Sequence, residues 1–197
     1  MKKIKILCIT VLILVLAVGG AVTVVIHDMV NTPSHKHCIK IAANFLSSYA
    51  SDNDGKYPVS KRGWGDALLK LNEIFPDAEW VPFFTGVGDY GSIYRDAIKD
   101  GHNIDESKCS RVYVQGLSRD SNRHIAILFD RDSVPGGDHL RSNLFGDPLR
   151  EVILVGGDMK IIKDPQWEKF VQSQRQLLSD EGFCEEVIRE VYGDPEQ

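Results

Sequence analysis

The sequence has little clustered positive charge, few cysteines and no recognisable catalytic motif. Its net charge is −5, and no stripe of Lys and Arg interleaved with aromatic residues occurs, so a nucleic-acid-binding surface is not expected. The Gly-x-Ser-x-Gly elbow of serine hydrolases, internal repeats and low-complexity tracts are all missing from the chain. With 43% hydrophobic and 26% charged residues in 197, the chain is typical of one globular domain plus an anchor.

Only four cysteines occur, and their positions limit how they pair. Cys8 falls inside an apolar run, which leaves Cys38, Cys109 and Cys184 for one disulfide and one leftover thiol in an oxidising compartment. Cys38 falls on the apolar face of a predicted helix, where a thiol behaves as a small hydrophobe. Cys109 and Cys184 have polar sequence neighbours and are the better pair, while three free thiols are an equally good alternative.

The first long hydrophobic run predicts a membrane anchor. Residues 6–26 are 21 residues without a charge, rich in Ile, Leu and Val. As a helix they span about 30 Å, the thickness of the hydrocarbon core of a bilayer. Lysines precede the run at Lys2, Lys3 and Lys5, so the positive-inside rule keeps the N-terminus in the cytoplasm. We expect a single-pass membrane protein with its C-terminal part outside the cytoplasm.

This interpretation divides the chain into four parts. Residues 1–5 form the cytoplasmic N-terminus, 6–26 the transmembrane anchor, 27–34 a juxtamembrane linker, and 35–197 an extracytoplasmic domain. A cleaved signal peptide is the competing interpretation, because residues 17–21 include small residues that suit a peptidase. The apolar run is longer than an ordinary signal-peptide core and continues past them, which favours an uncleaved anchor.

An amphipathic helix beginning near His35 is predicted to be the element on which the domain folds. Its apolar residues recur at helical spacing, which places them on one face. The segment 51–55, Ser-Asp-Asn-Asp-Gly, is a turn that ends the helix, and Tyr57-Pro58 is extended. The predicted face consists of Cys38, Ile41, Ala42, Phe45, Leu46 and Tyr49.

The first half of the remaining chain is predicted to be mostly helical. A short amphipathic helix covers 63–71, and Ser92 is expected to cap a helix over 93–100 that Gly101 closes. The proline-rich and aromatic segment 75–84 is expected to be irregular, with at most one short strand.

The second half is predicted to form antiparallel strands followed by helices. Residues 111–117 alternate like a half-buried strand, and 124–129 is its buried partner. A second hairpin joins 151–155 to 159–162 through a glycine turn. Asp164 is expected to cap a helix with Pro165 at its first position, and 184–192 is a further short helix. This order predicts an α+β fold with a small antiparallel sheet.

The segment from Cys38 to Pro58 resembles pilin-like proteins related to type II secretion pseudopilins, of the planctomycete and verrucomicrobial kind. In that family a membrane helix runs into a cysteine-containing helix that ends in Tyr, then Asp or Asn, Gly and Tyr-Pro. His139 and the strand, glycine turn and strand of 151–162 are similar to its C-terminal part. The resemblance hardly covers 60–108. It implies a pilin-like fold, a bacterial inner-membrane location with a periplasmic domain, and other pilin-like or secretion-system subunits as partners.

The chain departs from this family at its N-terminus. The family's processing signal is a glycine before an aromatic residue, with a glutamate five residues into the apolar helix, and this chain has neither. The resemblance therefore implies a pilin-like domain that stays on an uncleaved anchor.

The loop after the first hairpin is a candidate calcium site. Related pseudopilins hold calcium in an aspartate-rich C-terminal loop, and this hard cation prefers oxygen ligands. The residues 52–54 form a second, shorter acidic turn. Neither stretch fits the twelve-residue EF-hand pattern, and a solvated acidic loop is the alternative. The candidate ligands in the longer loop are Asp130, Asp132, Asp138 and Asp147.

Two other groups of residues are weaker candidates. His139 lies beside Asp138 with Ser133 and Ser142 nearby, which makes a membrane-tethered hydrolase the alternative function. His35, His37 and Cys38 do not face one another on a helix, so no zinc site is expected there.

The sequence as a whole favours a non-enzymatic structural protein. It would be anchored in the lipid bilayer through residues 6–26 and act in assembly, secretion or surface structure, with no nucleic acid bound and no cofactor other than the candidate calcium. A monomeric periplasmic binding module is the remaining alternative.

Overall fold

The computed structural model describes residues 36–85, 90–133 and 148–193, without the side chains of residues 36–38 and 90. The predicted anchor, residues 6–26, and the linker lie outside these ranges. Within them, no helix has both the length and the apolar character needed to cross a bilayer.

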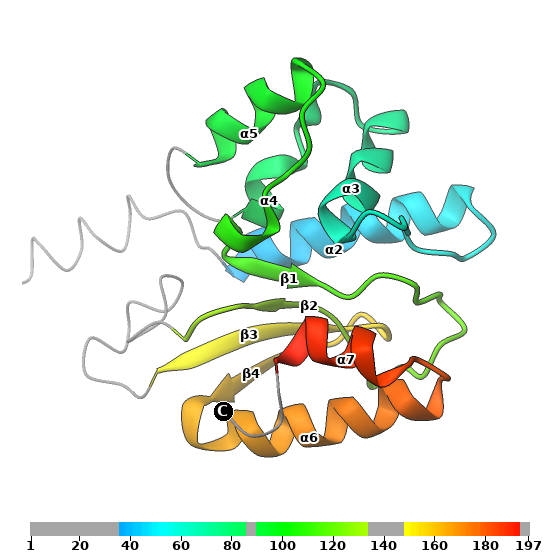
Figure 1. Ribbon diagram of the computed structural model, residues 1–197, viewed down its shortest axis with the longest axis vertical. Coiled ribbons are helices and arrows are strands. Elements are labelled where there is room, and N and C mark those ends of the chain that lie inside the picture. The colour runs from blue at the N-terminus through cyan, green and yellow to red at the C-terminus, as the bar shows by residue number, and fades with distance from the viewer. Residues whose placement is uncertain (1–35, 86–89, 134–147, 194–197) are drawn as a thin grey trace, which may run out of the picture. The chain divides into compact units, whose positions relative to one another are not determined.

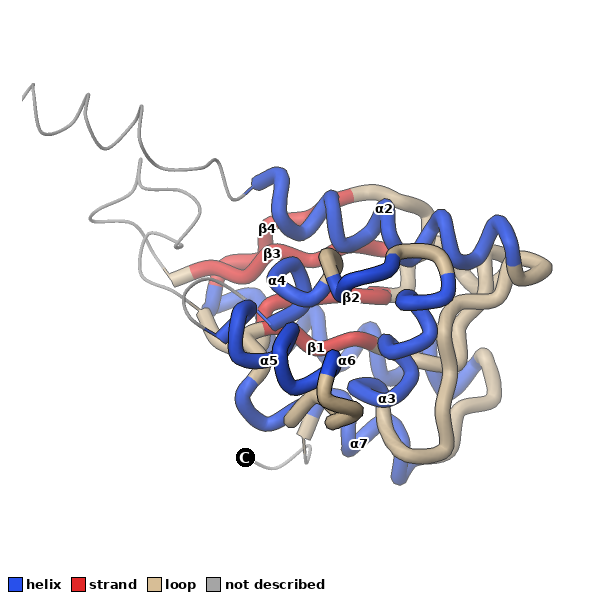
Figure 2. Tube along the Cα trace, turned by 90° about the horizontal axis from the view of Figure 1, so that it is seen from above, coloured by secondary structure: helices blue, strands red, loops and turns tan. Residues whose placement is uncertain are grey.

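A four-stranded antiparallel sheet with helices on both faces forms the domain (Figure 1). The strands follow one another in chain order as a meander. Figures 1 and 2 show α2 to α5 over one face and α6 and α7 over the other. The predicted α+β class is confirmed. The strands are β1 Arg111–Tyr113, β2 Ala126–Asp130, β3 Leu149–Leu154 and β4 Met159–Lys163, and the helices are α2 Lys36–Asp52, α3 Trp64–Leu68, α4 Val81–Thr85, α5 Tyr90–Lys99, α6 Asp164–Asp180 and α7 Glu185–Tyr192.

Strand β2 lies in the middle of the domain and is covered on both faces. Phe129 faces the C-terminal helices, where its ring centroid lies 5.6 Å from that of Trp167 and 5.2 Å from that of Tyr192. Its neighbour Asp130 faces the other side, toward Arg111. A strand covered on both faces needs apolar residues throughout, which explains the continuous apolar run in its sequence.

Helix α2 buries part of the apolar face that its sequence predicts, together with Ile39 and Ala50, which the prediction left out. Ala42, Leu46 and Tyr49 are all buried against the sheet side of the domain. Phe45 is half-buried and packs edge-on against Phe75, with ring centroids 4.6 Å apart. These contacts confirm α2 as an element of the core rather than a surface helix.

The predicted turn after α2 is also confirmed. Asp54 and Gly55 have positive φ angles of 52° and 76°, a conformation that Asn, Asp and Gly adopt most readily. The amide of Gly55 donates to the carbonyl of Ala50 at 2.8 Å, and the side chain of Asn53 donates to the carbonyl of Tyr49 at 2.9 Å. The last carbonyls of the helix are thus satisfied by the turn itself.

The segment 75–84 differs from its prediction. It contains a 3-10 turn, Pro76–Ala78, and helix α4 in place of a strand. Both prolines fall in the first turn of a helical element, where the missing N–H costs nothing. Trp80 and Phe84 are fully buried, so the apolar content of the segment serves helix packing.

The two predicted helix caps, Ser92 and Asp164, are wrong. Helix α5 begins at Tyr90, which places Ser92 inside its first turn. Helix α6 begins with Asp164 itself, and the preceding Lys163 makes no capping hydrogen bond through its side chain. The carboxylate of Asp164 instead accepts hydrogen bonds from Arg150 and Ser133.

A remote glutamate caps helix α3. The residue before the helix, Gly63, has no side chain to do so, and Glu106 Oε1 accepts a hydrogen bond from the amide of Gly65 at 2.6 Å. A Cβ atom on Gly65 would lie 2.8 Å from the carbonyl oxygen of Ile104, which explains the glycine. Burial raises the pKa of Glu106.

Replacing Glu106 by alanine should lower the free energy of unfolding by about 1 kcal/mol, because a helix loses its N-terminal acceptor. Urea unfolding of the full chain in a nonionic detergent measures this change. Glu106→Gln keeps an acceptor oxygen and should lose less, and Glu168→Ala on the exposed face of α6 is the control. Equal stability of Glu106→Ala and the parent chain would contradict the capping role.

Candidate functional site

The predicted calcium ligands divide between buried, exposed and undescribed positions. Asp130 is largely buried, Asp132 is exposed, and Asp138 and Asp147 lie outside the described residues. Both oxygens of Asp130 are already engaged: Oδ1 lies 3.3 Å from Arg111 Nε, and Oδ2 accepts from the amide of Glu151 at 2.9 Å. Across the described ranges no group of three His, Cys, Asp or Glu residues could hold a metal ion. The calcium site stays a prediction.

Asp130 belongs to a buried row of charged residues that crosses three strands. Arg111 pairs with Asp130 in the register of β1 and β2, and Glu151 follows on β3. Only 2% of the Arg111 side chain is exposed, and its guanidinium also donates to the carbonyl of Phe83 in α4. Burial raises the pKa of Asp130, and the charge of Arg111 opposes that rise. The row therefore lies between the sheet and α4, where it contributes to the structure of the core.

A second polar cluster joins the start of α6 to the sheet. Ser133 Oγ donates to Asp164 Oδ2 at 2.7 Å, and Arg150 Nη1 lies 2.6 Å from Asp164 Oδ1. The Arg150 guanidinium also lies over the ring of Trp167, 4.5 Å from its centroid. Ser133 thus has Asp164 as its carboxylate partner, whereas the sequence suggested a site around His139. His139 lies outside the described residues, so the hydrolase alternative stays a prediction.

The remaining sequence candidates add no chemistry to these clusters. His35 lies outside the described residues, and the side chains of His37 and Cys38 are not described. Asp52 and Asp54 of the second acidic turn are both exposed.

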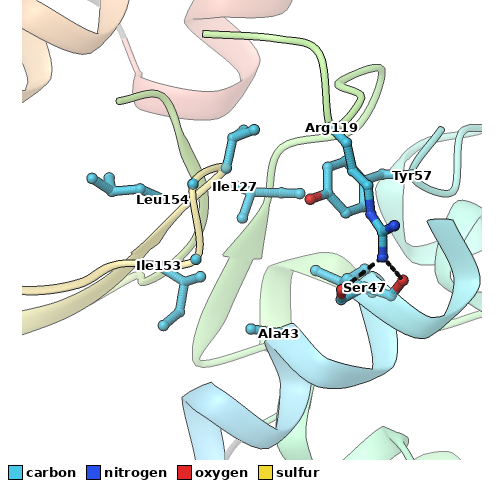
Figure 3. A pocket seen from close by; sticks show the side chains of 11 residues that line it. Ala43, Ser47, Tyr57, Arg119, Ile127, Ile153 and Leu154 are labelled. Carbon is cyan, nitrogen blue, oxygen red and sulfur yellow. Dashed lines mark hydrogen bonds between the residues drawn. The ribbon is translucent and has the colours of Figure 1, made fainter. Parts of the chain in front are cut away.

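A cavity that the sequence did not predict opens beside α2 (Figure 3). Its volume is about 350 Å³, and its walls come from α2, from the start of β2, from the end of β3 and from the turn between β3 and β4. Ala43, Leu46, Ile127 and Ile153 supply an apolar lining, and Tyr57 and Arg119 stand on the opposite side. These residues are scattered through the sequence in segments without a motif, so no sequence signal marks the cavity.

Arg119 is held against α2 at the mouth of this cavity. Its Nη2 donates to the carbonyl of Ser47 at 2.7 Å, to Ser47 Oγ at 3.0 Å and to Ser51 Oγ at 2.7 Å. A cation near the C-terminal part of a helix is also favoured by the helix dipole. The guanidinium is therefore fixed in position although the residue is exposed.

Cys109 and Cys184 are both free, so the suggested disulfide between them is not formed. Cys109 is buried, contrary to the polar surroundings that its sequence neighbours suggest. Its Sγ lies 3.5 Å from the carbonyl oxygen of Asp105, and burial raises the pKa of the thiol to about 12. Cys184 is exposed at the start of α7.

These environments predict very different thiol reactivity. The thiolate is the species that alkylating reagents attack, so Cys109 should react roughly 100-fold more slowly than Cys184 in the folded protein. Iodoacetamide labelling at neutral pH, followed by peptide mass spectrometry, resolves each cysteine separately. In urea the two rates should become equal. Equal rates in the folded protein would contradict the buried position of Cys109.

Comparisons with protein families, with curated proteins and with solved structures found no match to this chain.

Proposed function

We propose that this protein is a membrane-anchored, extracytoplasmic, pilin-like structural protein that acts through protein contacts in assembly, secretion or surface structure. The domain would stand on the periplasmic side of a bacterial inner membrane and take other pilin-like or secretion-system subunits as partners. Catalysis is not part of the proposed function.

The packing of α2 carries the proposal. This helix begins at Lys36, about ten residues after the predicted anchor of residues 6–26, and it buries Leu46 and Tyr49 in the core. The helix that follows the anchor in sequence is therefore one on which the sheet is built, which is the arrangement that a pilin-like resemblance implies. An antiparallel meander follows α2 in the chain, as the predicted pilin-like arrangement also requires.

The polar clusters support a structural role for the domain. Arg111 and Asp130 are buried and paired, and Ser133 and Arg150 are both bonded to Asp164. Each of these side chains has a charged partner. The first pair holds the sheet and α4 together, and the second cluster holds the sheet and α6 together. In some proteins, buried pairs of this kind select one packing arrangement over others.

Intact mass spectrometry of the protein purified from native membranes tests the anchor. A mass that includes residues 6–26 supports a permanently tethered domain. A mass that corresponds to a chain beginning after residue 21 would contradict the proposal. The domain would then be secreted free of the membrane. As a control, Leu14→Lys places a charge in the apolar run and should release the chain from the membrane fraction.

Crosslinking in intact membranes tests the partner. A structural subunit should give crosslinked species, with itself or with another membrane protein, that persist when the protein is expressed at its natural level. Monomer alone at every crosslinker concentration would contradict the assembly role and favour the monomeric binding module.

A further inference from the structure

The cavity beside α2 presents a side-chain hydroxyl, that of Tyr57, which no described residue uses. Tyr57 is only 7% exposed, and its ring contributes to the cavity wall. Figure 3 shows the hydroxyl directed toward Ile127 across the cavity. No residue in the described ranges accepts or donates a hydrogen bond at this oxygen, although the backbone amide of Tyr57 donates to Leu117 at 3.2 Å. The hydroxyl is therefore free to form a hydrogen bond with a ligand in the cavity.

The charge beside this hydroxyl is positive. Burial raises the pKa of Tyr57, and the nearby charge of Arg119 acts in the opposite direction. Within the described part of the chain, Arg119 forms its side-chain hydrogen bonds through Nη2 alone, which leaves Nε and Nη1 as further donors. No carboxylate is among the residues that line the cavity. The polar side of the cavity thus offers donors and positive charge, which suit an anionic acceptor.

The other side of the cavity is apolar. Leu46, Ile127, Ile153 and Leu154 form it, together with Ala43. At about 350 Å³ the cavity is at the small end of the roughly 300–1,000 Å³ range of ligand pockets. It therefore suits a small molecule with a short apolar body.

We propose that this cavity binds a small aliphatic carboxylate. The carboxylate accepts a hydrogen bond from the hydroxyl of Tyr57 and faces the guanidinium of Arg119, and the alkyl chain lies against Ile127 and Ile153. This site goes beyond the proposed structural role and does not depend on it, because every residue in it belongs to the folded domain.

Hexanoate is the probe for the test, with hexanol and hexylamine as neutral and cationic analogues of the same length. The full chain is placed in lipid nanodiscs, and dissociation constants are measured by ligand-observed NMR. Empty nanodiscs correct for partition of each probe into lipid. We expect saturable binding of hexanoate, weaker binding of hexanol and no saturable binding of hexylamine.

Variants of the cavity locate the binding. Tyr57→Phe removes only the hydroxyl and should weaken hexanoate binding roughly tenfold or more, the usual effect of losing a hydrogen bond to a charged group. Arg119→Gln should abolish the preference for hexanoate over hexanol. Ala43→Leu fills the apolar side and should block both probes. Lys99→Gln removes an exposed charge on α5, away from the cavity, and should change neither.

Two results would overturn the proposal. One is hexanoate binding no greater than that of empty nanodiscs. The other is hexanoate binding that neither Tyr57→Phe nor Ala43→Leu changes, with the circular dichroism of both variants equal to that of the parent chain. Either result leaves the anchor and crosslinking tests unaffected, so failure of the ligand site is distinguishable from failure of the structural role.

Discussion

Replacing Arg111 by methionine should remove about 3–5 kcal/mol from the free energy of unfolding, the largest single effect expected in this domain. Methionine keeps much of the volume and removes the charge. Asp130 then stays buried without its cation, and the desolvation of that carboxylate is no longer offset. Urea unfolding of the full chain in a nonionic detergent gives the difference, and Arg123→Met, at an exposed ion pair with Asp158, is the matched control.

The pH dependence of this variant provides a second readout. Without Arg111, the main effect that opposes burial is lost, and the pKa of Asp130 rises further above its value in the unfolded chain. The folded state then holds a proton that the unfolded state releases, so the stability of the variant increases as the pH falls. The deficit relative to the parent chain should therefore be smaller at about pH 5 than at about pH 8.

A double-mutant cycle separates the contribution of the Arg111–Asp130 ion pair from the loss of packing around Arg111. Adding Asp130→Asn to Arg111→Met removes the uncompensated charge, so part of the lost stability should return. Additive losses in the double variant, together with a deficit that does not change with pH, would show that the row contributes packing alone.

Replacing Leu46 by alanine should cost about 2–5 kcal/mol, the range found when a buried leucine is truncated. Leu46 is 1% exposed and stands at the centre of the α2 face that packs against the sheet. Its loss removes apolar contacts and enlarges the adjacent cavity. The measurement is the same urea titration.

The same helix offers the control for Leu46. Ser48 is exposed on the opposite face of α2, and Ser48→Ala should change the stability by less than about 0.5 kcal/mol. Similar losses for both variants would mean that the helix does not use one face for packing, which would contradict its role in the proposed function.

Helices and strands with a strong periodic pattern were predictable from the sequence. The face of α2 that contains Ala42 and Leu46 follows directly from the 3.6-residue period, and the turn at Gly55 follows from its turn-forming residues. The β3–β4 hairpin was equally clear, because a glycine turn separates two apolar runs. Local patterns of this kind depend on neighbours in the sequence, which a single chain displays.

Long-range contacts were not predictable in the same way. Glu106 caps a helix that begins 42 residues earlier, at Trp64, and nothing in either segment points to the other. Asp164 has the sequence of a helix cap, but Arg150 and Ser133 compete for its oxygens. The cavity likewise depends on Tyr57 and Arg119 meeting α2 in space. Tertiary contacts decide these roles.

The meander has a consequence for the order in which the chain folds. Each strand pairs with the next one along the chain, so strand pairing joins residues that are closer in the sequence than α2 and β3 are. Helix α2 is different, because part of its apolar face packs near Ile153, a hundred or so residues later. Because the ribosome makes the chain from its N-terminus to its C-terminus, α2 is made before β3, and the contacts between them form late. Nascent chains of this protein therefore leave part of the apolar face of α2 uncovered until β3 is complete, and that part is where a holding chaperone would act.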